Sequence, residues 1–145
     1  MSLQDPSKKM SKSDENPNAC VFILDDKDTV IRKFKRAVTD SDMEVCYKEG
    51  KDGINNLMTI YSSVTGKSID DITSEFAGKG YGDFKLAVGE AVADHLSPVR
   101  TEYSKLIQDK AYLKECYTAG AEAASKITRK TLSKVYRKVG FVDIR

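Results

Sequence analysis

The chain has 145 residues, of which 40% are hydrophobic and 32% are charged, and its formal net charge is only +2. This balance is typical of one soluble globular domain and excludes a largely disordered chain. No apolar run approaches the roughly 20 residues of a membrane-spanning helix, and the first twenty residues lack the apolar centre of a signal peptide. We therefore expect a cytoplasmic protein that does not enter a membrane.

Residues with metal-binding or nucleophilic chemistry are few and scattered. Cys20, Cys46 and Cys116 lie far apart, and His95 is the only histidine. A structural zinc site needs about four nitrogen or sulfur ligands at close spacing, so no metal site is predicted. His95 has no recognisable nucleophile or orienting partner, which favours a structural or surface histidine over a catalytic one.

The first part of the chain is predicted to be a loop that leads into a helix. Residues 1–19 contain turn formers and no apolar periodicity. The apolar run 20–24 is predicted to be a short extended segment laid on the core. Asp25 and Asp26 can then cap a helix. The apolar face of this first helix is expected at Val30, Ile31, Phe34, Ala37 and Val38.

Helical spacing continues to the end of the chain. A second helix runs from Ile54 to Val64 and is stopped by Gly66, and a capping box at residues 68–71 begins a third. Glycines interrupt residues 78–82, after which Asp83 is expected to cap a long helix. The last two helices are predicted from Phe84 to Leu106 and from Leu113 to Val135. The expected fold class is therefore all-α, a helical bundle preceded by a loop and a short extended segment.

Two basic clusters stand out on the predicted helices. Residues 32–36 contain four cations. The simpler interpretation is that they form a solvated face of the helix, and the alternative is that this face contacts phosphates. Seven cations occur between Lys126 and Arg145, and four of them follow helical spacing and form one stripe: Lys126, Lys130, Lys134 and Arg137. The simpler interpretation is that cations are favoured near a helix C-terminus, and the alternative is again a nucleic-acid contact.

The stretch KKMSKSDENPN, Lys8 to Asn18, combines lysines with small hydroxyl side chains in a loop. Ammonium groups are compact charges that can stabilise a triphosphate or a departing pyrophosphate, and the serines can hold its oxygens. Such a loop tightens only as the reaction proceeds, so we expect it to be mobile. From composition alone, a solvated tail is the favoured alternative.

Lys9 to Ser13 matches, letter for letter, the KMSKS signature of the class I aminoacyl-tRNA synthetases. Its surroundings resemble the bacterial-type tryptophanyl-tRNA synthetases, through segments that follow one another in the family's order. These segments are LQDPSKKMSKSDENPN, FILDD, IRKFKRAVTDS, NNLMTIYSSVTGKS, EFAGKGYGDFK, HLSPVRTEY and TLSKVYRKVG. The resemblance covers the chain from Leu3 to about Val142.

This resemblance implies a C-terminal fragment, because the family's catalytic domain carries an HIGH-like signature and His95 is the only histidine. Residues 1–24 would be the KMSKS loop and a connecting segment, and residues 25–145 the helical anticodon-binding domain. The whole enzyme would be a ligase of protein biosynthesis that uses ATP and Mg²⁺ to activate tryptophan and then attaches it to tRNA(Trp). The resemblance also implies that full-length members of the family are homodimers. The fragment alone is expected to be inactive and to hold no tightly bound cofactor.

The resemblance also assigns site residues. Lys9 and Lys12 would be catalytic, and together with Met10, Ser11 and Ser13 they would contact ATP. Candidates for tRNA contact are Asn55, Asn56, Lys79, Asp83 and Lys85, for which caps, turns and solvated charges are the simpler interpretation. One alternative is a free-standing helical module that binds RNA or a protein without catalysis. Another is an inactive piece with an exposed apolar patch near residues 20–24.

Overall fold

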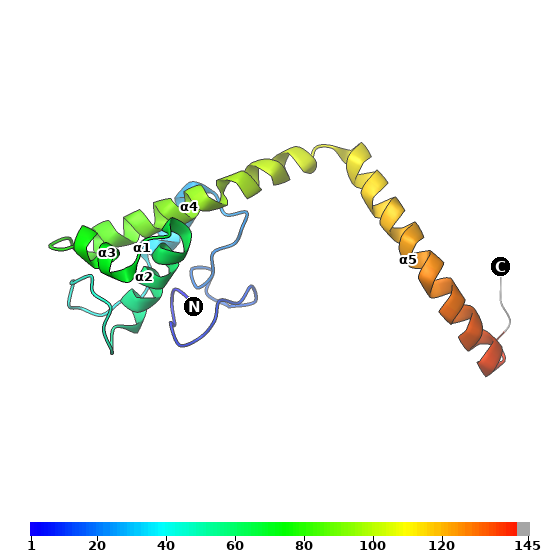
Figure 1. Ribbon diagram of the computed structural model, residues 1–145, viewed down its shortest axis with the longest axis horizontal. Helices are drawn as coiled ribbons and strands as arrows, with labels where there is room; N and C mark the ends of the chain where they lie inside the picture. The colour runs from blue at the N-terminus through cyan, green and yellow to red at the C-terminus, as the bar shows by residue number, and fades with distance from the viewer. Residues whose placement is uncertain (142–145) are drawn as a thin grey trace. The chain divides into compact units, whose positions relative to one another are not determined.

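The computed structural model describes residues 1–141, and in that range it contains five α-helices and no strand. The helices are α1 (Lys27–Lys35), α2 (Asp52–Thr65), α3 (Ile69–Glu75), α4 (Tyr81–Leu106) and α5 (Lys110–Val139) (Figure 1). The all-α prediction is confirmed. The chain divides into two compact units, one formed by Met1–Arg100 and one that begins at Thr101. The functional boundary expected between residues 24 and 25 stays a prediction.

The hydrophobic core lies in the first unit and draws on α1, α2, α3 and the first half of α4 (Figure 1). At its centre, the rings of Tyr61, Phe76 and Phe84 meet edge to face, with centroids 4.9 to 5.9 Å apart. This geometry places the positive edge of each ring against the negative face of another. Phe34 of α1 is also fully buried in this cluster of apolar side chains.

Most of the predicted helix ends are confirmed. The Asp26 carboxylate caps α1 by accepting a hydrogen bond from the Thr29 amide at 2.7 Å. Ser68 and Asp71 form the capping box of α3, and Gly66 ends α2 in the left-handed region with φ of 74°. The cap predicted at Asp83 is wrong, because α4 already begins at Tyr81. Asp83 instead lies in the first turn, where its negative charge interacts favourably with the positive end of the helix dipole.

Two further predictions near α1 need correction. The helix ends at Lys35, so Val38 lies beyond it and is 48% exposed. The segment 20–24 is laid on the core only through Val21, because the chain turns and leaves Phe22, Ile23 and Leu24 between 41% and 57% exposed. The exposed apolar patch expected near residues 20–24 is therefore present.

Lys33 does not belong to a solvated basic face. It lies one turn after Val30 and beside Phe34, so the helix turns it inward, and it is 5% exposed. Its ammonium contacts the Asp25 carboxylate at 2.6 Å, donates to the Cys20 carbonyl at 2.9 Å and lies 4.5 Å from the centre of the Phe22 ring. These contacts fix the apolar turn at residues 22–24 to α1.

The second unit contains the end of α4, a short turn and α5. Asp109 caps α5 by accepting a hydrogen bond from the Tyr112 amide at 2.9 Å. None of the 30 residues of α5 is buried, and Tyr117 and Ile127 are 64% and 73% exposed. Across residues 1–141, no helix is both long enough and apolar enough to cross a membrane.

Gly89 lies at a close approach of α4 to α1, and its replacement is expected to destabilise the first unit. A Cβ at position 89 would lie 2.9 Å from the Ile31 Cα, which cannot move without shifting the backbone. We expect Gly89→Ala to lower the free energy of unfolding by about 1–3 kcal/mol. Gly82→Ala, in the same helix with open space around it, is the control and should be neutral or stabilise by up to about 1 kcal/mol. Urea unfolding followed by tyrosine fluorescence measures both, and equal effects would refute the close approach.

The buried pair of Lys33 and Asp25 gives a second prediction. Asp25→Ala leaves a buried ammonium without its counter-charge, so we expect it to cost about 3 kcal/mol of unfolding free energy. The double variant Asp25→Ala/Lys33→Met removes both charges and should recover much of that loss. Asp28→Ala, at an exposed position in the first turn of α1, is the control. A double variant less stable than Asp25→Ala would contradict this account.

Candidate functional site

The loop that contains Lys9–Ser13 is closed at its base by Leu3. This side chain is 1% exposed, and its amide donates to the Ala19 carbonyl at 3.0 Å. The Leu3 carbonyl in turn accepts a hydrogen bond from the Val38 amide at 2.8 Å. Both ends of the loop therefore meet at one buried point just beyond α1, in the manner of an Ω-loop.

Asp5 fixes the segment of the loop that precedes the signature through contacts with Ser7 and Lys8. Its carboxylate accepts hydrogen bonds from the Ser7 hydroxyl at 2.6 Å and the Ser7 amide at 3.2 Å, and it pairs with the Lys8 ammonium at 2.9 Å. The bonds from Ser7, together with Lys8, hold the pKa of Asp5 at about 2, and the same pair raises the pKa of Lys8. The Lys8 carbonyl accepts from the Ser2 amide at 2.7 Å, so the backbone just before Lys9 is fixed.

Within the signature, Met10 contacts the core, whereas the two lysines are exposed to solvent. Met10 is half-buried and packs against the core. The hydroxyls of Ser11 and Ser13 lie 3.0 Å apart, and the Ser11 hydroxyl also accepts from the Ser13 amide. Lys9 and Lys12 are exposed, and neither makes a hydrogen bond or ion pair with residues 1–141. The loop thus presents two unpaired ammonium groups beside two hydroxyls, which suits an anionic ligand.

The limb that leaves the signature is built from side-chain turns. The Asp14 carboxylate accepts from the Asn16 amide at 2.9 Å, and the Asn16 side chain accepts from the Asn18 amide at 3.0 Å. Asn16 also reaches Gln4 at 3.4 Å, which links the two limbs, and Gln4 donates to the Arg36 carbonyl at 2.8 Å. The mobility expected for Lys8–Asn18 stays a prediction.

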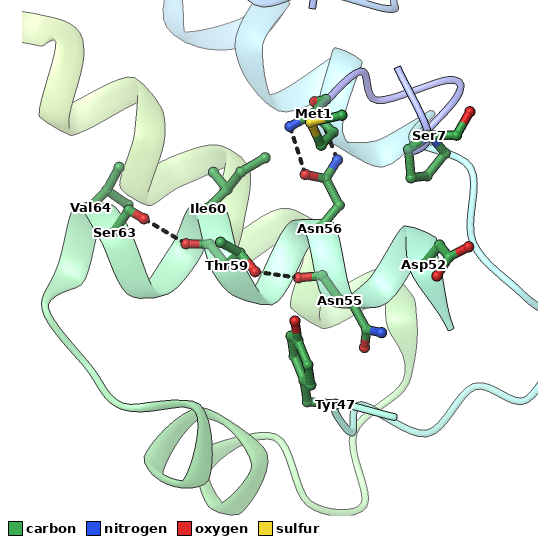
Figure 2. Close-up of a pocket in the computed structure, with 11 residues that line it drawn as sticks. Met1, Ser7, Tyr47, Asp52, Asn55, Asn56, Thr59, Ile60, Ser63 and Val64 are labelled. Atoms are coloured by element: carbon green, nitrogen blue, oxygen red, sulfur yellow. Dashed lines mark hydrogen bonds between the residues drawn. The ribbon is translucent and has the colours of Figure 1, made fainter. Parts of the chain in front are cut away.

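Asn55 and Asn56 line a groove of about 720 Å³ along α2 (Figure 2), but the amide groups of both side chains are engaged within the chain. Asn55 accepts from the Lys48 amide at 3.1 Å and donates to the Lys48 carbonyl at 2.7 Å. Asn56 points from α2 toward Met1 and accepts from its amino group at 2.9 Å (Figure 2). It also donates to the Ser2 carbonyl at 3.2 Å. These contacts suit structural roles, and tRNA contact through either side chain stays a prediction.

The remaining candidates for tRNA contact do not join that groove. Lys79 lies over the Phe76 ring, with its ammonium 5.0 Å from the ring centre. Lys85 is half-buried and donates to the Ala37 carbonyl and the Thr39 hydroxyl at 2.8 and 2.9 Å, and burial lowers its pKa. Lys79, Asp83 and Lys85 therefore lie outside the groove that Asn55 and Asn56 line.

A buried lysine that the sequence did not reveal holds the loop before α2. Lys51 is 6% exposed, and its ammonium lies 3.2 Å from both the Tyr81 hydroxyl and the Asp42 carboxylate. Tyr81 donates to the Asp40 carboxylate at 2.6 Å. Burial of the Tyr81 hydroxyl and, to a smaller extent, its bond to Asp40 raise the pKa of Tyr81 to about 12. Lys51 follows a glycine in a polar stretch, so no periodic signal marks it as buried.

A family profile described as tRNA synthetases class I (W and Y) matches residues 1–97, which include the closed loop and the core of the first unit. The chain belongs to this family. The family resemblance stated from the signature at Lys9–Ser13 is therefore confirmed. This match does not assign roles to individual side chains, so the ATP-contacting residues stay predictions.

Tryptophan–tRNA ligases are among the proteins to which this chain is similar. The enzyme of Clostridium tetani is 45% identical over 142 residues, which cover 98% of this chain and 42% of that enzyme. The enzyme of Halalkalibacterium halodurans is 47% identical over 141 residues, which cover 97% and 42%. The crystal structure of tryptophanyl-tRNA synthetase from Mycoplasma pneumoniae matches with a TM-score of 0.68 at 28% identity, over 99% of this chain and 45% of that one. The chain thus spans less than half the length of these relatives.

The contacts of Asp5 predict how its carboxyl group titrates. Because its pKa falls from 3.8 to about 2, the stabilisation it provides is complete above pH 3.8 and is lost as the pH falls through about 2. An NMR titration of the Asp5 side-chain carboxyl should therefore give a midpoint near 2. Ser7→Ala removes the strongest contact and should move the midpoint toward 3.8, with a smaller movement for Lys8→Ala. A midpoint near 3.8 in the unsubstituted chain would show that the contacts are not formed in solution.

Proposed function

We propose that this chain is the part of a tryptophan–tRNA ligase that carries the KMSKS loop and the helices that meet tRNA. The observation that carries the proposal is the closed loop that presents Lys9 and Lys12 without internal partners. The family match and the tryptophan–tRNA ligase relatives support the choice of reaction. The whole enzyme would activate tryptophan with ATP in the cytoplasm and transfer it to tRNA(Trp).

The chemistry that these lysines can supply is electrostatic. When a tryptophan carboxylate oxygen attacks the α-phosphorus of ATP, a new oxygen–phosphorus bond forms and the bond to the departing pyrophosphate breaks. Negative charge then grows on the pyrophosphate oxygens, and ammonium groups placed there stabilise the transition state more than the ground state. In this scheme Lys9 and Lys12 meet that charge, while the hydroxyls of Ser11 and Ser13 orient phosphate oxygens. Met10 holds the loop against the core.

The other requirements of the reaction belong to the longer protein. The tryptophan pocket and most of the ATP site would come from the part of the relatives that this chain does not match. Across residues 1–141, no group of three or more His, Cys, Asp or Glu side chains is placed to hold a metal ion. The described residues therefore do not provide a Mg²⁺ cage. The homodimer of the family would likewise be a property of the whole enzyme.

The proposal predicts the effect of removing the loop cations. The test protein is a chimera in which this chain replaces the matching 142 residues of the C. tetani ligase. We expect Lys12→Ala to lower kcat for ATP–pyrophosphate exchange by about 100-fold, because one preorganised donor is typically worth that much. The KM for tryptophan should change little. Lys9→Ala should act in the same direction.

Lys8→Ala is the matched control, since its ammonium is already paired with Asp5 and should change kcat by only a few fold. Equal losses for Lys8→Ala and Lys12→Ala would contradict the assigned roles. An inactive unsubstituted chimera that still binds RNA would favour the alternative, a free-standing helical module without catalysis.

A further inference from the structure

The second half of α5 concentrates positive charge that the first half does not. Between Glu122 and Asp143 the sequence contains no acidic residue. Over the same stretch, α5 carries six cations, all of them exposed: Lys126, Arg129, Lys130, Lys134, Arg137 and Lys138. None of the six forms an ion pair with residues 1–141, whereas Lys33 and Lys51 in the first unit are both paired.

Four of these cations form one row, which we call the α5 basic track: Lys126, Lys130, Lys134 and Arg137. At about 100° per residue, they fall within an arc of roughly 80° on the helix surface. Successive lysines are four residues apart, so they rise by about 6 Å each along the axis. This repeat is comparable to the separation of neighbouring phosphates along a nucleic-acid strand.

Favourable interaction with the helix dipole does not explain the track. That effect fades within the last turn of a helix. Because α5 ends at Val139, Lys126 and Lys130 lie more than two turns before the end. Like charges four residues apart also repel and weaken a helix. The row therefore works against the stability of α5 in the absence of an anionic ligand.

The side chains on the face of α5 opposite the track favour RNA over a lipid surface as the ligand of the track. The larger apolar side chains on the side of this half of α5 away from the track are Leu132, Val135 and Val139, between 47% and 56% exposed, and the half-buried Tyr136, with no Trp or Phe among them. Membrane-surface helices instead rely on a broad apolar face with Trp, Phe and Leu. A row of cations without interleaved aromatic residues suits a phosphate backbone, for which charge alone supplies most of the affinity.

We propose that the α5 basic track binds the phosphate backbone of tRNA. The proposal rests on the proposed function for the identity of the nucleic acid, and it adds a surface separate from Asn55, Asn56, Lys79, Asp83 and Lys85. Phosphate contacts position an RNA without reading its sequence. The track accordingly supplies affinity and orientation, and base recognition must come from other residues.

The experiment is a titration of this chain with a fluorescently labelled tRNA(Trp) transcript at several salt concentrations. Lys130→Gln/Lys134→Gln removes two neighbouring charges of the track. We expect its Kd at about 0.1 M salt to rise roughly tenfold. The slope of log Kd against log salt should become shallower by about 1.5 to 2.

Lys110→Gln/Lys114→Gln is the matched control, because it removes two exposed lysines at the same spacing from the same helix, but outside the track. It should change Kd by less than about twofold. Lys130→Arg/Lys134→Arg keeps the charge and should keep both the affinity and the slope. This variant shows whether weaker binding comes from the loss of positive charge or from a disturbed helix. Equal losses for the two glutamine pairs, or no loss for either, would overturn the proposal.

Binding to anionic phospholipid vesicles that exceeds binding to tRNA, with the same dependence on Lys130 and Lys134, would assign the track to a lipid surface instead and would also overturn the proposal. The titration contains no ATP, so its outcome is independent of the test of Lys9 and Lys12. A failure of one proposal can therefore be told apart from a failure of the other.

Discussion

The burial of Leu3 is the constraint on which the candidate site depends. Its backbone carries one hydrogen bond to Ala19 and one to Val38, so a single residue closes the loop and ties it to the chain beyond α1. A buried backbone group without a partner is costly, so these bonds and the buried side chain support one another. The position of Lys9 and Lys12 is set by this base and by Met10, because their own side chains make no hydrogen bond or ion pair with the described residues.

Cations in this chain have three different environments, which explains why composition alone says little about them. Lys33 and Lys51 are buried and stabilised by carboxylates, so they act as structural links. Lys8 is exposed but held by Asp5 at the entry to the loop. The loop lysines and the α5 basic track are exposed and unpaired within the described residues. The charges of this third group are available to a phosphate, and they differ from other exposed lysines such as Lys110 and Lys114 in lying on one loop or along one row.

The helices and their ends could be predicted from the sequence because local rules decide them. Gly66 and the pair of Ser68 and Asp71 act within a few residues of their own position, and periodicity located the apolar faces of α2 and α4. The loop lysines were found through a five-residue signature. The inward position of Lys33 follows from its helical spacing to Val30 and Phe34, but its positive charge favoured a solvated face. The burial of Lys51 and the engagement of Asn56 were missed because they depend on distant segments: Lys51 contacts Tyr81, and Asn56 contacts residues 54 or 55 positions away. No local pattern carries that information.

The absence of buried side chains in α5 has a consequence for how the chain unfolds. A helix without tertiary packing is stabilised only by its own hydrogen bonds and caps, and so it lacks the contribution that stabilises most helices in proteins. Its amide protons can then exchange through local opening, while those of α2 and the start of α4 require disruption of the core. Loss of helical signal on heating would accordingly begin in α5 and report little about the stability of the KMSKS loop.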